Sequence, residues 1–185
     1  MDTACNILAN QKVLYHGHAV AAIAARSEAA AIAALDLIDI EYEVLRPVLS
    51  IDDAISAQAP ILHETMMTQG LAEPATEASN ISARTELKKG DIEAGFAAAD
   101  VIVERAYDTP TVHQGYIEPH ATTVVFNDNG PSMIWCPTQG HFDVRARVAQ
   151  LLNLELGQIK VVASEIGGGF GGKTTVYLEP VALIL

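Results

Sequence analysis

The stretch IKVVASEIGGGFGGKT, residues 159–174, joins an apolar run to a loop with five glycines in six positions. The apolar, β-branched residues of 159–166 predict a strand, and the apolar segment after the loop predicts a helix. A glycine-rich loop in that setting turns backbone N–H groups inward at the positive end of a helix. The sequence therefore predicts an anionic or electron-rich ligand at this loop.

The same letters fit the phosphate-cradle pattern G-x-x-x-x-G-K-[ST] through Gly167, Gly172, Lys173 and Thr174. A phosphate cradle of that class normally follows the first strand of its domain, and the magnesium-binding acid comes later. Only residues 175–185 follow here. A nucleotide-binding module therefore stays as a weaker alternative, as does a glycine-rich turn without any ligand.

Composition and charge set the broad class of the protein. The 185 residues are 50% hydrophobic and 18% charged, which is typical of a globular chain with one ordinary or two small domains. The net charge of -12 argues against nucleic-acid and anionic-membrane partners. Cys5 and Cys136 have no metal-ligand spacing, so reduced thiols and a soluble, cytoplasmic protein are expected.

The first third of the chain predicts a compact α/β unit. Residues 12–25 predict two short strands or one bulged strand, and Ser27 is a suitable N-cap for an Ala-rich helix over 28–38. The alternating residues 40–45 predict a half-buried strand, and 51–58 predict a short helix.

The remaining two thirds begin with residues 59–85, which carry Pro and Gly and predict a linker. After it, Asp91 is expected to cap a short helix, and a strand is expected over 99–109. Asn129-Gly130 predicts a hairpin turn with positive φ. A helix is expected over 141–154, with its buried stripe at the positions Phe142, Ala146, Ala149 and Leu152.

The segment EIGGGFGGK, ending at Lys173, resembles the loop that holds the molybdenum cofactor in the xanthine dehydrogenase / aldehyde oxidase family. Residues 12–55 are similar to the closing half of that family's α/β-hammerhead domain. Residues 90–124 and 134–173 are similar to the opening of its first molybdopterin-binding domain. The resemblance implies a mixed fold, α+β with α/β features.

The domain order that follows from this resemblance has three parts. The C-terminal part of a hammerhead domain is expected over 1–58, a linker over 59–85, and the N-terminal part of a molybdopterin-binding domain over 86–185. The apolar C-terminal run has no helix-ending residue, which predicts a chain that is cut at its end. The resemblance then implies a fragment of a large molybdenum-binding subunit, or a truncated reading frame. On that interpretation the chain is inactive alone.

The resemblance also implies a cofactor and a reaction. The cofactor is molybdenum-molybdopterin, either as such or as its cytosine dinucleotide. The reaction is hydroxylation of an aldehyde or an N-heterocycle, with water as the oxygen source. Electrons leave through iron–sulfur clusters and FAD on other domains or subunits. The general-base glutamate of the family lies far downstream of the glycine loop, so no complete catalytic set is expected in this chain.

By the same resemblance, Gln139 matches a glutamine that donates a hydrogen bond to an oxygen ligand of molybdenum. Gly169, Phe170 and Gly171 match loop positions whose backbone approaches the molybdenum site. Thr174 stands where purine-hydroxylating members have a substrate-binding glutamate, which makes xanthine a less favoured substrate. Without the resemblance, Gln139 would be a residue that caps the following helix.

Several polar residues are assigned no chemistry. Glu118 and His120 are interpreted as structural, shaping the loop before the strand at 123. His16 and His18 are expected on one strand face, and His18 stands where the family often has Gln. With no third ligand nearby, surface histidines are favoured over a metal pair.

Three further side chains could in principle act in catalysis. Thr138 and Ser164 lack the partners of a nucleophile, and Glu179 is not interpreted as the general base. A non-catalytic chain that folds only by docking on a partner remains the third hypothesis for function.

Overall fold

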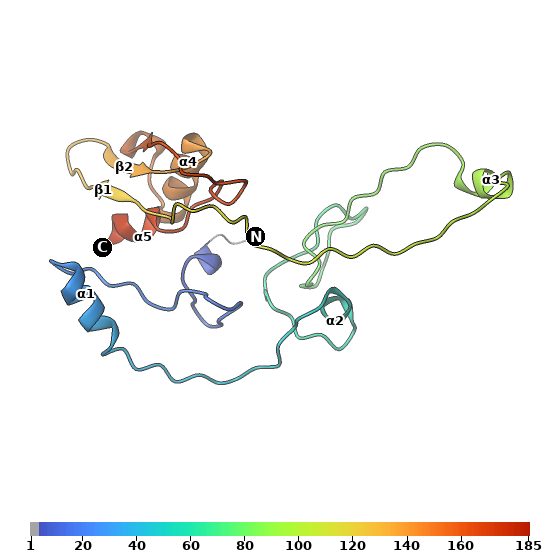
Figure 1. Cartoon of the computed structure of the whole chain (residues 1–185), viewed down its shortest axis with the longest axis horizontal. Helices are drawn as coiled ribbons and strands as arrows, with labels where there is room; N and C mark the ends of the chain where they lie inside the picture. The colour runs from blue at the N-terminus through green and yellow to red at the C-terminus, as the bar shows by residue number, and fades with distance from the viewer. Residues whose placement is uncertain (1–3) are drawn as a thin grey trace. The chain divides into compact units, whose positions relative to one another are not determined.

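The computed structural model describes residues 4–185, and their contacts divide into two compact units. One unit is Tyr42–Thr111. The other combines residues 4–41 with Val112–Leu185 and contains the sheet (Figure 1).

A three-stranded sheet organises the unit that contains Val112–Leu185. Its strands are β1 (Thr123–Val125), β2 (Ser132–Cys136) and β3 (Ile159–Ala163), in that order. β1 and β2 form the predicted antiparallel hairpin, while β2 and β3 run parallel. Gly130 does not adopt a positive φ, so that part of the turn prediction is wrong. The Asn127 side chain shapes the turn instead, by accepting a hydrogen bond from the backbone N–H of Asn129 at 3.0 Å.

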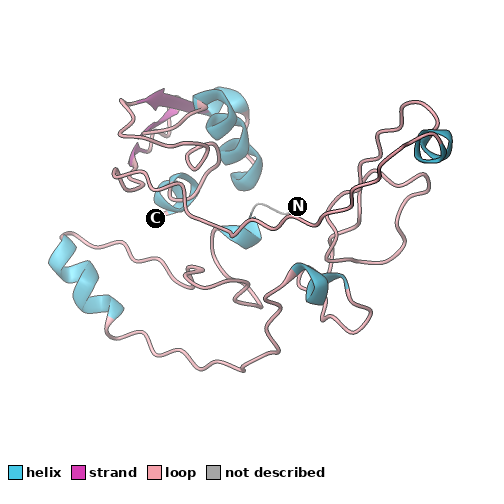
Figure 2. Cartoon of the chain, turned by 45° about the vertical axis from the view of Figure 1, so that its right-hand side comes forward, coloured by secondary structure: helices cyan, strands magenta, loops and turns pink. Residues whose placement is uncertain are grey.

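Helix α4 (His141–Leu152) connects the two parallel strands and packs against β3 (Figure 2). A short 3-10 helix, η2 (Leu156–Gln158), leads from α4 into β3, and helix α5 (Glu179–Ile184) contacts both β1 and α4. These elements enclose one apolar core. Its fully buried members are Ile134, Cys136, Val144, Val148, Ala149, Ile159 and Val176.

Helix α4 forms where the sequence predicts it, and its buried face is predicted in part. Ala149 is buried and Leu152 packs against the core, as predicted, whereas Phe142 is 72% exposed and Ala146 is also exposed. Val144 and Val148 are buried in place of the two exposed residues. β-branched Val144 and Val148 pack on the sheet, because they are the apolar pair at i, i+4 spacing that meets the core.

The N-terminal segment of this unit holds the 3-10 helix η1 (Ala4–Asn6) and helix α1 (Glu28–Leu35). Ser27 caps α1 as predicted, by accepting a hydrogen bond from Ala30 N at 3.3 Å. No strand forms over 12–25, so that prediction is wrong. A strand needs a neighbour for its N–H and C=O groups, and no described residue pairs with 12–25 in a sheet ladder.

The Tyr42–Thr111 unit contains the two short helices α2 (Ile51–Ile55) and α3 (Ile92–Ala97). Side chains cap both N-termini: Ser50 accepts from Asp53 N, and Asp91 accepts from Ala94 N as predicted. Isolated β-bridges join Met67 to Ala78 and Gln69 to Ala83.

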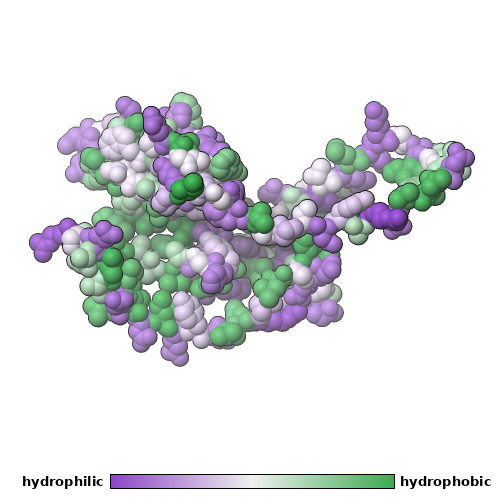
Figure 3. Space-filling view, viewed as in Figure 1, coloured by the Kyte–Doolittle hydropathy of each residue, from purple (hydrophilic) through white to green (hydrophobic). Residues whose placement is uncertain are grey.

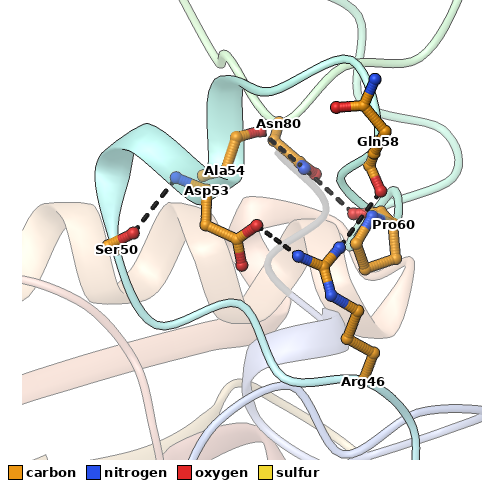
Figure 4. A network of polar contacts seen from close by, with 7 residues as sticks. All are labelled: Arg46, Ser50, Asp53, Ala54, Gln58, Pro60 and Asn80. Atoms are coloured by element: carbon orange, nitrogen blue, oxygen red, sulfur yellow. Dashed lines mark hydrogen bonds and ion pairs between the residues drawn. The ribbon is translucent and has the colours of Figure 1, made fainter.

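A polar network surrounds α2 (Figure 4). The Arg46 guanidinium donates to Asp53 Oδ1 at 2.5 Å and to the Gln58 carbonyl at 3.1 Å. The Asn80 amide donates to the carbonyls of Ala54 and Pro60. Arg46 thus joins the chain before α2 to the helix and to the residue Gln58 after it. Asn80, which lies in the segment predicted as a linker, joins that segment to α2 through Ala54.

The predicted strands at 40–45 and 99–109 are also wrong, since both segments run extended without a ladder partner among residues 4–185. No residue from 42 to 111 is buried, and large apolar side chains there are exposed, such as Val44 at 91% and Leu87 at 93%. Hydrophobic residues accordingly form much of the visible surface (Figure 3).

From residue 4 onward, every helix is too short or too polar to span a lipid bilayer.

Candidate cofactor site

Two loops meet at the carboxyl ends of the parallel strands. Gln139 lies in the loop from β2 to α4, and the glycine loop, residues 167–173, follows β3. Because β2 and β3 are parallel neighbours, both loops leave the same edge of the sheet. That edge is where open α/β sheets bind their ligands.

Gln139 is joined to the glycine loop by three hydrogen bonds. Its side-chain Oε1 accepts from Gly171 N at 3.0 Å and from Lys173 N at 3.1 Å. Its backbone N–H donates to the Lys173 carbonyl at 2.8 Å. These bonds fix which end of the amide faces the loop, so the Nε2 end points elsewhere. Within the described chain, Nε2 has no hydrogen-bond acceptor.

The path of the loop depends on glycine at position 169. A Cβ built on Gly169 would lie 2.6 Å from Gln139 Oε1 and 2.9 Å from its Cδ. Any larger residue would displace the Gln139 side chain. The absence of a side chain at Gly169 is therefore what allows Gln139 to approach the loop.

Phe170 occupies the left-handed region, with φ of 50°, and its side chain is 74% exposed. Only a small share of residues other than glycine adopt such a backbone, and they are enriched at ligand sites. The backbone N–H of Phe170 has no hydrogen-bond acceptor anywhere in residues 4–185. Gly171 differs, because its N–H donates to Gln139 and its carbonyl accepts from Thr174 Oγ1 at 3.0 Å.

An ion pair lies at the two ends of the loop. Lys173 Nζ donates to Glu118 Oε2 at 2.6 Å, and Gly167 N donates to the same oxygen at 2.7 Å. Lys173 is 1% exposed and Glu118 34% exposed by side chain. The hydrogen bond from Lys173, followed by that from Gly167, lowers the pKa of Glu118 below its ordinary value. Glu118 therefore holds the glycine loop, whereas the sequence predicted that it shapes the loop before the strand at 123.

Aromatic residues pack beside this ion pair. Lys173 Nζ lies 5.0 Å from the centre of the Tyr116 ring, and Tyr116 Oη is hydrogen-bonded to His120 Nε2 at 2.8 Å. Burial, and secondly the Lys173 charge, lowers the pKa of His120. Burial likewise raises the pKa of Tyr177, whose ring packs against His120. Both shifts favour the neutral forms of His120 and Tyr177 beside the lysine.

Glu179 and Cys136 are both buried in the unit that contains the sheet. Glu179 is 6% exposed and accepts a hydrogen bond from Tyr177 N at 2.9 Å. Burial, with Glu179 as the second cause, raises the pKa of the Cys136 thiol to about 12. Cys136 is thus a protonated core residue, and Glu179 stabilises the start of α5.

The two residues examined as nucleophiles have structural contacts instead. Thr138 is 5% exposed, donates to the Lys173 carbonyl at 3.2 Å and accepts from Gly140 N at 3.1 Å. Ser164 is exposed, and its backbone N–H donates to the Cys136 carbonyl at 3.2 Å. Neither hydroxyl lies in a hydrogen bond with a base.

His16 and His18 do not share a face, because the segment is no strand. His16 is exposed, whereas His18 is 6% exposed, accepts from Leu14 N through Nδ1 and stacks on Tyr15. From residue 4 to 185, no group of three or more His, Cys, Asp or Glu side chains could hold a metal ion.

The chemistry of the loop does not suit a phosphate. Lys173, the residue that would reach the phosphates in a nucleotide cradle, is buried and neutralised by Glu118. The groups left open within the described chain include Gln139 Nε2 and the Phe170 N–H, which are neutral donors. A neutral donor set suits a ligand that carries oxygen acceptors but needs no added positive charge at this edge.

Sequence reasoning missed the Glu118–Lys173 pair and the part played by Thr138. The two charged residues stand 55 positions apart, so no local pattern joins them. The one signal was a lysine placed between a glycine run and an apolar helix, where a solvated charge is unexpected.

The fold brings the Gln139 loop and the glycine loop together at the carboxyl edge of a mixed sheet. Residues 72–185 match the family model for the molybdopterin cofactor-binding domain. Residues 1–46 match the model for the a/b hammerhead domain of aldehyde oxidase and xanthine dehydrogenase. The chain therefore belongs to the xanthine dehydrogenase / aldehyde oxidase family of molybdopterin-binding proteins. The predicted order, hammerhead before molybdopterin-binding domain, is confirmed.

Individual relatives agree with the family. The chain is 34% identical to the "Probable hypoxanthine oxidase XdhD" of Escherichia coli strain K12, over 92% of this chain. It is 32% identical to the "Nicotinate dehydrogenase large molybdopterin subunit" of Eubacterium barkeri, over 93%. It is 31% identical to the "Xanthine dehydrogenase molybdenum-binding subunit" of Escherichia coli O157:H7, over 100%. The chain spans 20%, 37% and 23% of the lengths of these relatives, respectively.

Proposed function

We propose that this chain supplies one wall of the molybdenum cofactor site in a molybdenum hydroxylase. The wall consists of Gln139 and the glycine loop, residues 167–173. The enzyme hydroxylates an aldehyde or an N-heterocycle and takes the oxygen from water. The domain boundaries proposed for the chain are a hammerhead part over 1–58, a linker over 59–85 and a molybdopterin-binding part over 86–185.

One observation carries this proposal. Gln139 Oε1 is occupied by two loop N–H groups, at 3.0 and 3.1 Å, which leaves Nε2 as the open end of the amide. Phe170 N–H is a further open donor, on a residue with a left-handed backbone. Two neutral donors fixed by the fold support a role in holding oxygen ligands of a cofactor without changing its charge.

When bound, the cofactor supplies the redox chemistry, which protein side chains cannot perform. Gln139 would hold it through Nε2, and Phe170 would hold it through its backbone N–H. The exposed Phe170 ring would exclude water from the face that it covers. Gly169 leaves the space that Gln139 occupies. In the overall reaction a substrate C–H becomes C–OH, water provides the oxygen, and an electron pair leaves with two protons.

The substrate proposal rests on Thr174. It is uncharged and exposed, and its hydroxyl donates to the Gly171 carbonyl rather than outward. A substrate that requires a carboxylate at this position is disfavoured. The relatives' names include nicotinate and hypoxanthine as well as xanthine, which supports N-heterocycles as a class.

The electron pair needs an acceptor that this chain does not provide. We propose iron–sulfur clusters and FAD on other domains or subunits as that route. Two relatives are named as a "large molybdopterin subunit" and a "molybdenum-binding subunit", which supports a multi-component enzyme. The cofactor is proposed as molybdenum-molybdopterin or its cytosine dinucleotide form.

The test is to purify the enzyme that contains this chain and measure molybdenum by mass spectrometry. Turnover of nicotinate, hypoxanthine and an aromatic aldehyde is then followed in ¹⁸O-labelled water. Stoichiometric molybdenum and ¹⁸O in the product are expected. A preparation without molybdenum that binds ATP tightly, and loses that binding on Lys173→Ala, would overturn the proposal in favour of a nucleotide-binding module.

A further inference from the structure

Glu118 and Lys173 join the two ends of the glycine loop to each other. Glu118 Oε2 receives hydrogen bonds from Gly167 N, where the loop begins, and from Lys173 Nζ, where it ends. A Cβ built on Gly167 would lie 2.7 Å from Glu118 Cβ, so the backbone passes directly over the glutamate. One carboxylate oxygen therefore sets the separation of the loop ends.

The backbone of Lys173 also links the end of the glycine loop to Gln139. Lys173 N donates to Gln139 Oε1 at 3.1 Å, and the Lys173 carbonyl accepts from Gln139 N at 2.8 Å. Thr138 Oγ1 donates to the same carbonyl at 3.2 Å. Any shift of Lys173 must therefore move Gln139, whose Nε2 is the open donor.

We propose that Glu118 and Lys173 are positioning residues, which hold the glycine loop and the Gln139 amide in register with the cofactor. This inference rests on the proposed function, because the object being positioned is the donor for that cofactor. Neither charge contacts the cofactor in this assignment. Their effect passes through Gly167 at one end of the loop and Gln139 at the other.

Burial makes the two partners unequal. Lys173 is 1% exposed, so its charge depends on Glu118 and on the face of the Tyr116 ring. Glu118 is 34% exposed and can be solvated if the lysine is removed. Losing the carboxylate is therefore more damaging than losing the ammonium, because it leaves a buried charge without a counter-ion.

The test compares Glu118→Gln, Lys173→Met and the double variant in the purified enzyme that contains this chain. Lys160→Met is the matched control, since Lys160 is an exposed lysine on β3 of the same unit. Three quantities are measured: hydrogen exchange of the 164–175 peptide, the denaturant midpoint, and kcat with KM. Exchange is read on the protein itself and does not depend on cofactor loading.

Faster exchange of the 164–175 peptide is expected in Glu118→Gln, with a smaller effect in Lys173→Met. The double variant is expected to regain the denaturant midpoint, because no uncompensated charge remains. Its kcat stays reduced roughly ten- to a hundredfold at nearly unchanged KM, as for a misplaced group. A purely structural pair would restore kcat together with the midpoint.

Unchanged loop exchange in Glu118→Gln would overturn the positioning role, and so would a double variant with wild-type kcat. Lys160→Met is expected to match the wild type in all three measurements. A wild-type enzyme without molybdenum would refute the proposed function instead. In that event the exchange data alone decide whether the pair orders the loop.

Discussion

The Gln139 side chain accepts a hydrogen bond from the backbone of Gly171 through Oε1, with an O···N distance of 3.0 Å. This bond joins the loop between β2 and α4, which holds the acceptor Gln139, to the loop after β3, which holds the donor Gly171. It uses the carbonyl end of the amide inside the protein and leaves the NH₂ end open. A glutamine thereby becomes an oriented donor at the carboxyl edge of the sheet.

Replacing Gly169 by alanine should displace Gln139. The new Cβ would lie 2.6 Å from Gln139 Oε1, far inside van der Waals contact. Oε1 is the end of a flexible side chain, so it can give way by losing its hydrogen bonds to the loop, and we expect a loss of about 1 kcal/mol in the free energy of unfolding. Urea denaturation of Gly169→Ala measures this change. Gly157→Ala is the control, since nothing lies within 4 Å of a Cβ there. Equal stability of the two variants would refute the steric role of Gly169.

Phe170 offers a test of backbone strain. Its φ of 50° is costly for any residue with a Cβ, whereas glycine adopts it freely. Phe170→Gly and Phe170→Ala both remove the exposed ring. We expect the glycine variant to be more stable than the alanine variant by about 1 kcal/mol. The denaturant midpoints of Phe170→Gly and Phe170→Ala measure this difference. An alanine variant at least as stable as the glycine variant would show that the backbone at Phe170 is not strained.

His120 predicts a pH dependence of stability. Burial lowers its pKa in the folded protein, while the unfolded chain has the ordinary value of about 6.5. Above that pH both states hold a neutral imidazole. As the pH falls below it, the unfolded state binds a proton first, so stability is lost until the pH passes the folded pKa.

This dependence can be measured by urea denaturation between about pH 7.5 and about pH 5. The wild-type chain should lose stability over that range, and His120→Asn should show a smaller slope. An identical slope in the variant would mean that His120 does not contribute, and other groups would then account for the loss.

Local signals in the sequence predict the short elements well. Ser27 and Asp91 cap helices because a side-chain oxygen and a nearby N–H suffice, whatever the rest of the chain does. The hairpin of β1 and β2 and the strand at Ile159–Ala163 also follow from their own residues. The parallel pairing of β2 with β3, which brings Gln139 to the loop, is a long-range property.

The strands expected at 12–25, 40–45 and 99–109 do not form, because strand formation depends on distant parts of the chain and not on local signals alone. The apolar residues of 12–25 and the alternation in the other two segments are real, but a strand exists only where another strand pairs with it. The helix at 141–152 shows a related limit: its existence is predictable, while the face that it buries depends on the sheet beneath. The contact of Glu118 with Lys173 is likewise invisible, since it joins residues 55 positions apart.

The central claim is that Gln139 Nε2 is a hydrogen-bond donor for the cofactor. Gln139→Glu tests it most directly, because the carboxylate can still accept from Gly171 and Lys173 but cannot donate. Gln139→Ala, which loses both the acceptor and the donor, is the companion variant.

The decisive measurement is kcat of the cofactor-loaded Gln139→Glu enzyme, together with hydrogen exchange of the 164–175 peptide. The predicted result is wild-type protection of the loop with kcat reduced by about a hundredfold, the usual effect of removing one preorganised donor. Protection and turnover that both equal those of the wild type would contradict the claim.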